Sequence, residues 1–463
     1  MRVKLQLIIG LSLCAIAVTS LSAQGPYKAT WESLDTHKMP SWYDDAKIGL
    51  SMHWGVYSVP AWAPREKGLS YAEWYGNRMH EKGSPAVDYH RENYGENFTY
   101  DDFISQWKAE NYNPTEWAKF ARNMGANYMF ITSKHHDGFC LWPTKYTDRN
   151  AMKMGPHKDL LGEFVAAGRK ENLKVGFYYS LYEWYNPIYT GKEIPYAGLK
   201  KVNNYVDDFM IPQIKEIIDT YHPDFMYFDG EWDHPESFWK MKEVVAYYYN
   251  EAIKRNQEVF VNDRFGKDER GKHGDLYNVE YDGEKGSEGL LSHNWSYWQG
   301  IAKTFGYNQD TDPQDCLSPK QFIDKVIKGV SHNGNFDINV GPTAAGLIPE
   351  YEQYPLLKLG EWLKTNGEAI YGSRYWKVKQ QEGDAFFTSK GDNVYAIFLK
   401  WQGEEFKLKS VKPVAGSKIT MLGVAGDLKW KWDATNGLTI IYPSQKARPT
   451  SCSYAWAFKI KVK

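Results

Sequence analysis

Short apolar runs alternate with longer segments of helical periodicity along most of this chain. Residues 48–54 form an apolar run with the length of a buried strand. The segment that begins at Asn113 has the signals of a helix start, because Asn is a good N-cap and Pro114 and Glu116 occupy positions that favour the first turn. Gly125 then ends this helix. The same alternation predicts further strands at residues 128–132, 174–180, 225–229, 259–264, 276–280 and 336–340, and further helices at residues 159–172, 202–221, 237–256, 320–330 and 355–365.

This order of elements predicts an α/β fold. Apolar strands that are separated by helices are typical of a parallel sheet whose two faces are both covered. The number of strand–helix units favours a (β/α)8-type TIM barrel over an open sheet. From about residue 377 the pattern changes to short alternating runs, such as residues 393–399, with Gly-Asp, Asn-Gly and Pro breaks between them. We therefore predict a catalytic barrel over residues 24–372, followed by a C-terminal antiparallel β-sandwich over residues 373–463.

The N-terminal segment has the pattern of a targeting sequence. Arg2 and Lys4 precede an apolar stretch that runs to Leu21, and Ser22-Ala23 supplies small residues for cleavage. This predicts a secretory signal peptide over residues 1–23, and hence a secreted or periplasmic protein. A lipoprotein anchor at Cys14 ranks second, because Leu13 is too bulky for that cleavage. The rest of the sequence contains no apolar stretch long enough to predict a membrane span.

Charge and cysteine content exclude several classes of protein. A formal net charge of −1 gives no field that would attract nucleic acid or an anionic membrane. Cys140, Cys316 and Cys452 would remain after cleavage of the signal peptide, and this odd, widely spaced set predicts neither a disulfide framework nor a zinc site. No cofactor motif is found either. The aromatic content of 16% is high, and although most of these rings belong to a core, aromatic faces also stack on sugar rings.

Polar and titratable residues follow several of the predicted strands. A parallel barrel has its active site at the C-terminal ends of its strands. His53 ends the first predicted strand, residues 133–138 follow the second, Asp229 ends another and residues 262–264 end a further one. Asp229-Gly230 alone would read as a hairpin turn, but its place between a parallel-type strand and a long helix weakens that interpretation. These residues therefore predict a polar cleft at one end of the barrel.

The two adjacent histidines of this cleft do not indicate a metal site. His135 and His136 point in different directions, and no carboxylate or cysteine stands at ligand spacing beside them. An ionised acid among aromatic and histidine side chains, without a cofactor, instead fits glycoside hydrolysis, which uses two carboxylates. Asp229 fits the nucleophile, and Arg264 is placed to hold a nearby acid ionised or to bind the sugar. The second carboxylate is left open by this reasoning among Glu280, Glu284 and Glu288.

Several longer motifs occur in one order along the chain. Residues 47–62 (KIGLSMHWGVYSVPAW), residues 134–139 (KHHDGF) and residues 228–230 (FDG) are the most distinctive, and residues 73–75, 339–342 and 367–372 accompany them. Together they resemble the α-L-fucosidases of glycoside hydrolase family 29 over about residues 30–372. The resemblance implies a barrel with a C-terminal β-sandwich, a retaining mechanism and a fucosylated oligosaccharide or glycoconjugate as substrate. From the motifs, charge and hydropathy above, we expect no cofactor, no metal, no nucleic-acid partner and no membrane span.

The resemblance also implies roles for individual residues. Asp229 would be the nucleophile. The acid/base of the family precedes a segment whose counterpart here begins at Asn294, which favours Glu288, then Glu284 and last Glu280. The fucose subsite would be lined by His53, Glu73, Trp74, His135, His136, Tyr179 and Arg264. Two alternatives stay open: a fucose-binding protein of this fold with lost or weak catalysis, and a retaining glycosidase for a related sugar such as galactose.

Overall fold

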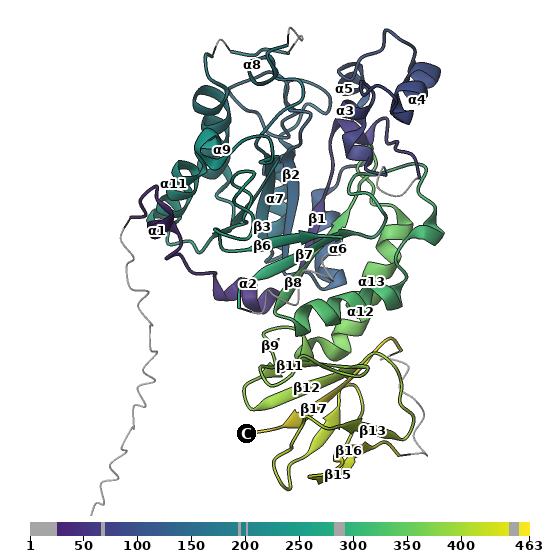
Figure 1. The fold of residues 1–463 in the computed structure, drawn as a ribbon. Helices are drawn as coiled ribbons and strands as arrows, with labels where there is room; N and C mark the ends of the chain where they lie inside the picture. The colour runs from purple at the N-terminus through teal and green to yellow at the C-terminus, as the bar shows by residue number, and fades with distance from the viewer. Residues whose placement is uncertain (1–25, 66–69, 193–195, 201, 282–291, 444–452) are drawn as a thin grey trace, which may run out of the picture.

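An eight-stranded parallel sheet curls into a barrel at the centre of the molecule (Figure 1). The structure is a computed structural model, and it describes residues 26–463 except 66–69, 193–195, 201, 282–291 and 444–452. The strand order is β5-β4-β3-β2-β1-β8-β7-β6, and a parallel bridge between Asn262 and Leu276 joins the two outer strands. The predicted barrel is thus confirmed. Its strands are β1 (Ile48–Met52), β2 (Tyr128–Lys134), β3 (Lys174–Ser180), β4 (Phe225–Asp229), β5 (Phe260–Val261), β6 (Tyr277–Glu280), β7 (Trp295–Gly300) and β8 (Gly334–Val340).

Helices cover the outside of this barrel. Within the described residues no helix lies between β5 and β6, so the regular alternation is interrupted there. None of the described helices is both long and apolar enough to cross a membrane. The longer helices are α4 (Pro85–Tyr94), α6 (Pro114–Met124), α7 (Leu160–Lys170), α9 (Ile211–Tyr221), α11 (Met241–Lys254), α12 (Pro319–Ser331) and α13 (Glu350–Asn366). The shorter ones are α1 (Trp31–Leu34), α2 (Ser41–Ala46), α3 (Tyr75–Arg78), α5 (Asp102–Gln106), α8 (Pro187–Thr190) and α10 (Glu236–Trp239), with a π-helix at Val206–Met210 and single 3-10 turns at Val56–Ser58, Ala72–Trp74, Pro313–Asp315 and Gly367–Ala369.

The caps that the sequence offers set several of these helix ends. The side chain of Asn113 accepts a hydrogen bond from the Glu116 N–H at 3.3 Å, and Gly125 closes α6 in the left-handed conformation at φ 95°. The helix predicted over residues 237–256 is divided instead, because Lys240 adopts φ 55° and separates α10 from α11. Strand β7 was not predicted, because its polar Ser296 and Gln299 interrupt the apolar run that marks a buried strand.

Aromatic side chains fill the barrel interior below the carboxyl ends of the strands. Tyr128, Phe130, Phe225, Tyr227 and Trp298 belong to this interior cluster. Asp337 of β8 lies fully buried among them and accepts hydrogen bonds from the hydroxyl of Tyr128 at 2.6 Å and from that of Tyr227. Burial raises the pKa of Asp337 despite these hydrogen bonds. The packed interior gives the end of the barrel a rigid floor.

Two antiparallel sheets follow the barrel and enclose a separate apolar core, as a β-sandwich does. The first sheet has the order β10-β11-β12-β17-β14, with β9 paired to β11, and the second has the order β13-β16-β15. Their strands are β9 (Arg374–Tyr375), β10 (Gln381–Glu382), β11 (Ala385–Lys390), β12 (Asn393–Phe398), β13 (Glu405–Leu408), β14 (Ile419–Met421), β15 (Lys429–Asp433), β16 (Gly437–Ile441) and β17 (Trp456–Lys461). The prediction of a C-terminal antiparallel β-region is confirmed.

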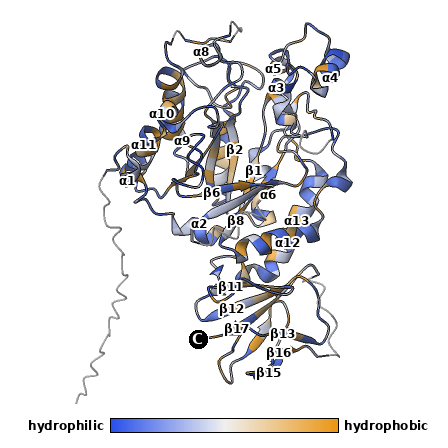
Figure 2. Ribbon diagram, viewed as in Figure 1, coloured by the Kyte–Doolittle hydropathy of each residue, from blue (hydrophilic) through white to orange (hydrophobic). Residues whose placement is uncertain are grey.

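Helices α12 and α13 lie between the barrel and these C-terminal sheets, and both carry hydrophobic as well as hydrophilic residues (Figure 2). The indole N–H of Trp362 in α13 donates to the Ala455 carbonyl at 2.9 Å. Phe386, Tyr395 and Ile397 of the first C-terminal sheet belong to the same apolar core as the barrel helices. The C-terminal sheets therefore pack on the barrel through a shared core, at the end of the molecule opposite α3, α5 and α8.

A buried carboxyl group in α13 makes stability depend on pH. Glu352 is 2% exposed and accepts a hydrogen bond from the Gly341 N–H at 3.0 Å; burial nevertheless raises its pKa from 4.5 to about 8. Between these two values the unfolded chain ionises Glu352 while the folded chain keeps it protonated, so the free energy of unfolding falls as the pH rises. At a pH below 4.5, Glu352 is protonated in both the folded and the unfolded chain and does not lower the free energy of unfolding. Between pH 5 and pH 8 we expect the free energy of unfolding to fall by about 2–4 kcal/mol more in the wild type than in Glu352→Gln.

Thermal unfolding of both proteins at the two pH values measures this effect. Glu361→Gln is the control, because the Glu361 side chain lies on the same helix and is 59% exposed. Equal pH dependence in the wild type and in Glu352→Gln would contradict the prediction.

Candidate active site

A cavity of about 150 Å³ opens at the carboxyl ends of the barrel strands. Its walls come from the ends of most of the strands and from the loops that follow them. Six of the predicted subsite residues line it, together with the predicted nucleophile: His53, Glu73, Trp74, His135, His136, Arg264 and Asp229. The other lining residues are Tyr71, Tyr178, Trp232, Arg270, Glu280, Trp298 and Phe305.

Asp229 ends β4 with its carboxylate facing the cavity. The Tyr178 hydroxyl donates to its Oδ2 atom at 2.7 Å, and the Arg264 guanidinium donates to its Oδ1 atom. Burial acts to raise the pKa of Asp229, but the positive charges of Arg264 and Arg270 and the Tyr178 hydrogen bond together hold it below its usual value. Asp229 is 8% exposed, so the cavity contains an ionised carboxylate that is largely shielded from water.

Arg264 joins this carboxylate to a second one. Its Nη1 atom bonds to Asp229, while its Nη2 atom bonds to Oε1 of Glu280 and, at 3.0 Å, to Oδ1 of Asn278. Glu280 ends β6, and its side chain is 32% exposed, against 11% for the side chain of Asp229. The Arg264 guanidinium thus bonds to two acids that differ in solvent exposure. Asp229 and Glu280 lie on opposite sides of the bridge that connects β5 to β6.

Two histidines of the cavity have a fixed tautomer. Nδ1 of His53 lies 2.7 Å from Oδ1 of Asn339, which only accepts, so His53 carries its proton on Nδ1. Nδ1 of His136 lies 2.7 Å from the Ser180 hydroxyl, which itself donates to the Tyr182 carbonyl at 2.7 Å and therefore accepts from His136. Burial lowers the pKa of His53 to about 4 and that of His136 to about 3. Both rings are neutral at pH 7, and each keeps an Nε2 atom that accepts hydrogen bonds.

The remaining polar groups of the cavity also suit a hydroxylated ligand. Oε2 of Glu73 accepts from the Gly306 N–H at 2.8 Å and from the Thr304 hydroxyl at 3.2 Å, and burial raises the pKa of Glu73 to about 7. Nδ1 of His135 is buried and has no hydrogen-bond partner among the described residues. A buried polar atom without a partner is costly, so a ligand hydroxyl that bonds to His135 would relieve that cost.

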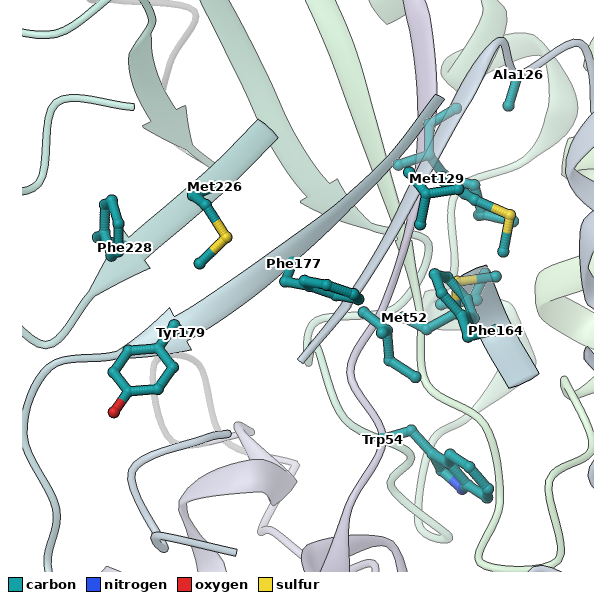
Figure 3. Close-up of a cluster of buried hydrophobic side chains, with 14 of the residues drawn as sticks. Met52, Trp54, Ala126, Met129, Phe164, Phe177, Tyr179, Met226 and Phe228 are labelled. Atoms are coloured by element: carbon teal, nitrogen blue, oxygen red, sulfur yellow. The ribbon is translucent and has the colours of Figure 1, made fainter. Parts of the chain in front are cut away.

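Tyr179 does not lie in the cavity, which corrects one sequence prediction. Its hydroxyl donates to Oε1 of Gln213 at 2.9 Å and accepts from Nζ of Lys134 at 3.0 Å. Tyr179 belongs to the buried cluster outside the sheet that Figure 3 shows, together with Phe177 and Phe228. Successive side chains of a strand point to opposite faces, so Tyr178 faces the barrel interior and takes the place that was predicted for Tyr179.

Three sequence predictions fall on residues that the structure does not describe. Glu288 and Glu284 lie within residues 282–291, and the predicted signal peptide lies within residues 1–25. Glu280, the least favoured acid in the sequence, is described and lines the cavity. In the part of the chain that the structure describes, no group of three His, Cys, Asp or Glu side chains is arranged to hold a metal ion.

Several cavity residues were not predicted from the sequence. Tyr178 and Trp298 are inward-facing residues of β3 and β7; the first depends on the register between β3 and β4, and the second lies on a strand that was not predicted. Tyr71, Trp232, Arg270 and Phe305 come from loops, where no periodicity marks which side chains face a cavity.

An ionised aspartate and a second carboxylate, held by one arginine at the carboxyl ends of a parallel barrel, define the class of glycoside hydrolases. Comparison with known proteins specifies the family. A model of the α-L-fucosidase family matches residues 14–368, and a model of the α-L-fucosidase C-terminal domain matches residues 379–461. The chain belongs to the α-L-fucosidase family.

Curated relatives and solved structures agree with this assignment. The tissue α-L-fucosidase of Homo sapiens is 37% identical over 446 residues, which cover 95% of this chain and 93% of that protein. The crystal structure of Thermotoga maritima α-fucosidase in complex with a mechanism-based inhibitor has a TM-score of 0.80 at 36% identity, and the match covers 94% of this chain and 100% of that one. α-L-Fucosidase isoenzyme 1 from Paenibacillus thiaminolyticus has a TM-score of 0.72 at 25% identity, with coverage of 91% and 98%.

Proposed function

We propose that this α-L-fucosidase removes terminal α-L-fucosyl residues from fucosylated glycans with retention of configuration, using Asp229 as the nucleophile and Glu280 as the acid/base. The observation that carries the proposal is the pair of carboxylates that Arg264 joins inside one cavity. The proposal includes export of the chain by the predicted signal peptide, residues 1–23, to a compartment where such glycans occur.

The first step forms a covalent intermediate. An oxygen of Asp229 attacks the anomeric carbon, the bond from that carbon to the leaving oxygen breaks, and Glu280 gives its proton to that oxygen. The product is a fucosyl ester of Asp229 and an ionised Glu280. Esterification neutralises Asp229, so the Arg264 guanidinium is then available to stabilise the newly ionised Glu280.

The second step releases fucose. Glu280 accepts a proton from a water molecule, the water oxygen attacks the anomeric carbon, and the ester bond to Asp229 breaks. Two inversions at one carbon give net retention. The 32% exposure of the Glu280 side chain supports this role, because the group must meet the leaving oxygen, water and a fresh proton in turn.

Glu73 is the other buried acid of the cavity, and its contacts favour a binding role. It is 2% exposed, and the Gly306 N–H and the Thr304 hydroxyl fix its Oε2 atom. A carboxylate held in this way accepts hydrogen bonds from sugar hydroxyls in a fixed direction. The neutral His53 and His136 rings provide further acceptors, and the Trp298 and Phe305 rings provide an apolar wall of the kind that the 6-methyl group of fucose requires.

Product stereochemistry tests the retaining mechanism. We expect proton NMR of an early reaction with an aryl α-L-fucoside to show α-fucose first and β-fucose only after mutarotation. An initial β-product would mean inversion, because a general base would then activate water directly. Binding without turnover of any fucoside would support a fucose-binding protein, and faster turnover of the matching aryl galactoside would support the related-sugar alternative.

A further inference from the structure

A second arginine of the cavity is held by a buried carboxylate that the proposed mechanism does not use. Arg270 lies in the loop between β5 and β6 and lines the cavity. Its Nε atom bonds to Oε1 of Glu231, whose side chain is 1% exposed, while the Arg270 side chain is 48% exposed. Burial of a carboxylate is costly, so a buried acid that fixes an exposed guanidinium indicates that the position of that guanidinium matters.

The contact through Nε leaves the outer edge of this guanidinium available. Arginine has five N–H donors in a planar fork, and four of them belong to the two terminal amino groups. Among the described residues, none accepts a hydrogen bond from these two groups of Arg270. The fork therefore presents directed donors at the cavity rim, in a geometry that suits a pair of neighbouring oxygen atoms.

Barrel topology places Arg270 beside the bond that breaks. Asp229 ends β4 and Glu280 ends β6, so the anomeric carbon and the leaving oxygen lie between these two strand ends. Strand β5 stands between β4 and β6, because it pairs with β4 and is bridged to residue Leu276 just before β6. The loop that follows β5, which carries Arg270, therefore faces the leaving group.

Charge also limits what this arginine recognises. Arg264 bonds to Asp229 and Glu280, whereas Arg270 bonds to Glu231. Its own charge is matched by Glu231, and the pair as a unit offers hydrogen-bond donors and little net charge. Oxygen atoms of a neutral sugar fit this arrangement better than an anionic substituent does.

We propose that Arg270, positioned by Glu231, binds the first sugar of the leaving group through its hydroxyl or ring oxygens. This inference rests on the proposed function, because it takes Asp229 and Glu280 as the two ends of the reaction. It assigns the leaving-group subsite to the loop after β5. Arg270 is the binding residue, and Glu231 is a positioning residue that acts through it.

The test compares two substrates that share fucose and differ in the leaving group: an aryl α-L-fucoside and a fucosyl disaccharide that the wild type cleaves. For Arg270→Ala we expect kcat/KM on the disaccharide to fall roughly tenfold to a hundredfold more than on the aryl fucoside, since charge-assisted hydrogen bonds to the sugar are lost. Lys267→Ala is the matched control, because Lys267 is an exposed cation of the same loop that does not line the cavity. This control should leave the ratio of the two kcat/KM values as in the wild type.

Two further variants examine the positioning role. Arg270→Lys keeps the charge but removes the fork, and it should shift the ratio nearly as far as Arg270→Ala. Glu231→Gln should shift the ratio in the same direction, and adding it to Arg270→Ala should cause no further shift, because residues that act as one unit are not additive.

The outcomes separate this inference from the proposed function. Equal losses on both substrates, or no change on either, would overturn the assignment of Arg270 to the leaving group. A shift of the ratio by Glu231→Gln that persists in the Arg270→Ala background would overturn the positioning role. A wild-type protein that cleaves neither fucoside would instead refute the proposed function itself.

Discussion

Asp229→Asn should lower kcat/KM on an aryl α-L-fucoside by at least about a thousandfold, which corresponds to roughly 4 kcal/mol of lost transition-state stabilisation. Asparagine has nearly the same shape and still reaches Tyr178 and Arg264, but its amide is no nucleophile. Steady-state kinetics with equal amounts of folded protein measure the loss, and circular dichroism checks that the fold is intact.

The control for this experiment is Asp233→Asn. Asp233 is an exposed acid four residues along the same loop, where it accepts a hydrogen bond from the Tyr189 hydroxyl at 2.8 Å and does not line the cavity. Its replacement should leave turnover near the wild-type rate. Asp229→Gly adds a positive test, because azide in the vacated space should restore cleavage and give a β-L-fucosyl azide. An Asp229→Asn protein that keeps a tenth of the wild-type activity would rule out Asp229 as the nucleophile.

Glu280→Gln should have the second largest effect, and its size should depend on the leaving group. A fucosyl disaccharide has a basic leaving oxygen that needs a proton, so we expect kcat/KM to fall by about 10²–10⁴-fold. A nitrophenolate leaves without protonation, so the rate of the first step with a nitrophenyl fucoside should fall much less. Comparison of the two substrates at several pH values measures the difference, and the pH limb that belongs to the acid should disappear in the variant.

Glu288→Gln and Glu284→Gln are the competing variants, because the sequence alone favours Glu288. Only the variant that lacks the acid/base should show a loss of kcat/KM that grows as the leaving group becomes poorer. If Glu288→Gln shows this pattern and Glu280→Gln does not, the assignment returns to Glu288. Glu73→Gln should lower kcat/KM by a similar factor on both substrates, since a residue that binds the fucosyl hydroxyls contacts the part that the two substrates share.

Most of the barrel could be predicted because its information is local. The apolar runs and the caps at Asn113 and Gly125 depend only on residues that are close in the sequence. The structure has strands at the apolar runs, and α6 begins and ends at the two caps. Strand β7 and the join of β5 to β6 could not be predicted, since each depends on partners that are distant in the chain. The sequence predicted that Asp229 lies in the active site because Asp229 ends an apolar run. It did not predict this for Arg270, because the sequence of a loop has no periodicity that marks which side chains face a cavity.

The choice between Tyr178 and Tyr179 depends on the register of β3 against β4. Asp229 must face the barrel end, and β3 and β4 pair with Ser180 opposite Asp229 and Tyr178 opposite Tyr227. Side chains that lie opposite each other in a parallel sheet share a face, so Tyr178 faces inward with Tyr227 and Tyr179 faces outward with Phe228. The register itself, however, is a product of folding and cannot be read from either strand alone.

The shared core between the barrel and the C-terminal sheets governs how those sheets can be studied. Trp362 of α13 reaches Ala455 across the junction. Truncation of the chain after the barrel would remove the C-terminal part of this core and expose apolar side chains of α12 and α13 to solvent. An inactive truncated enzyme would therefore report aggregation, and would not reveal whether the C-terminal region touches sugar.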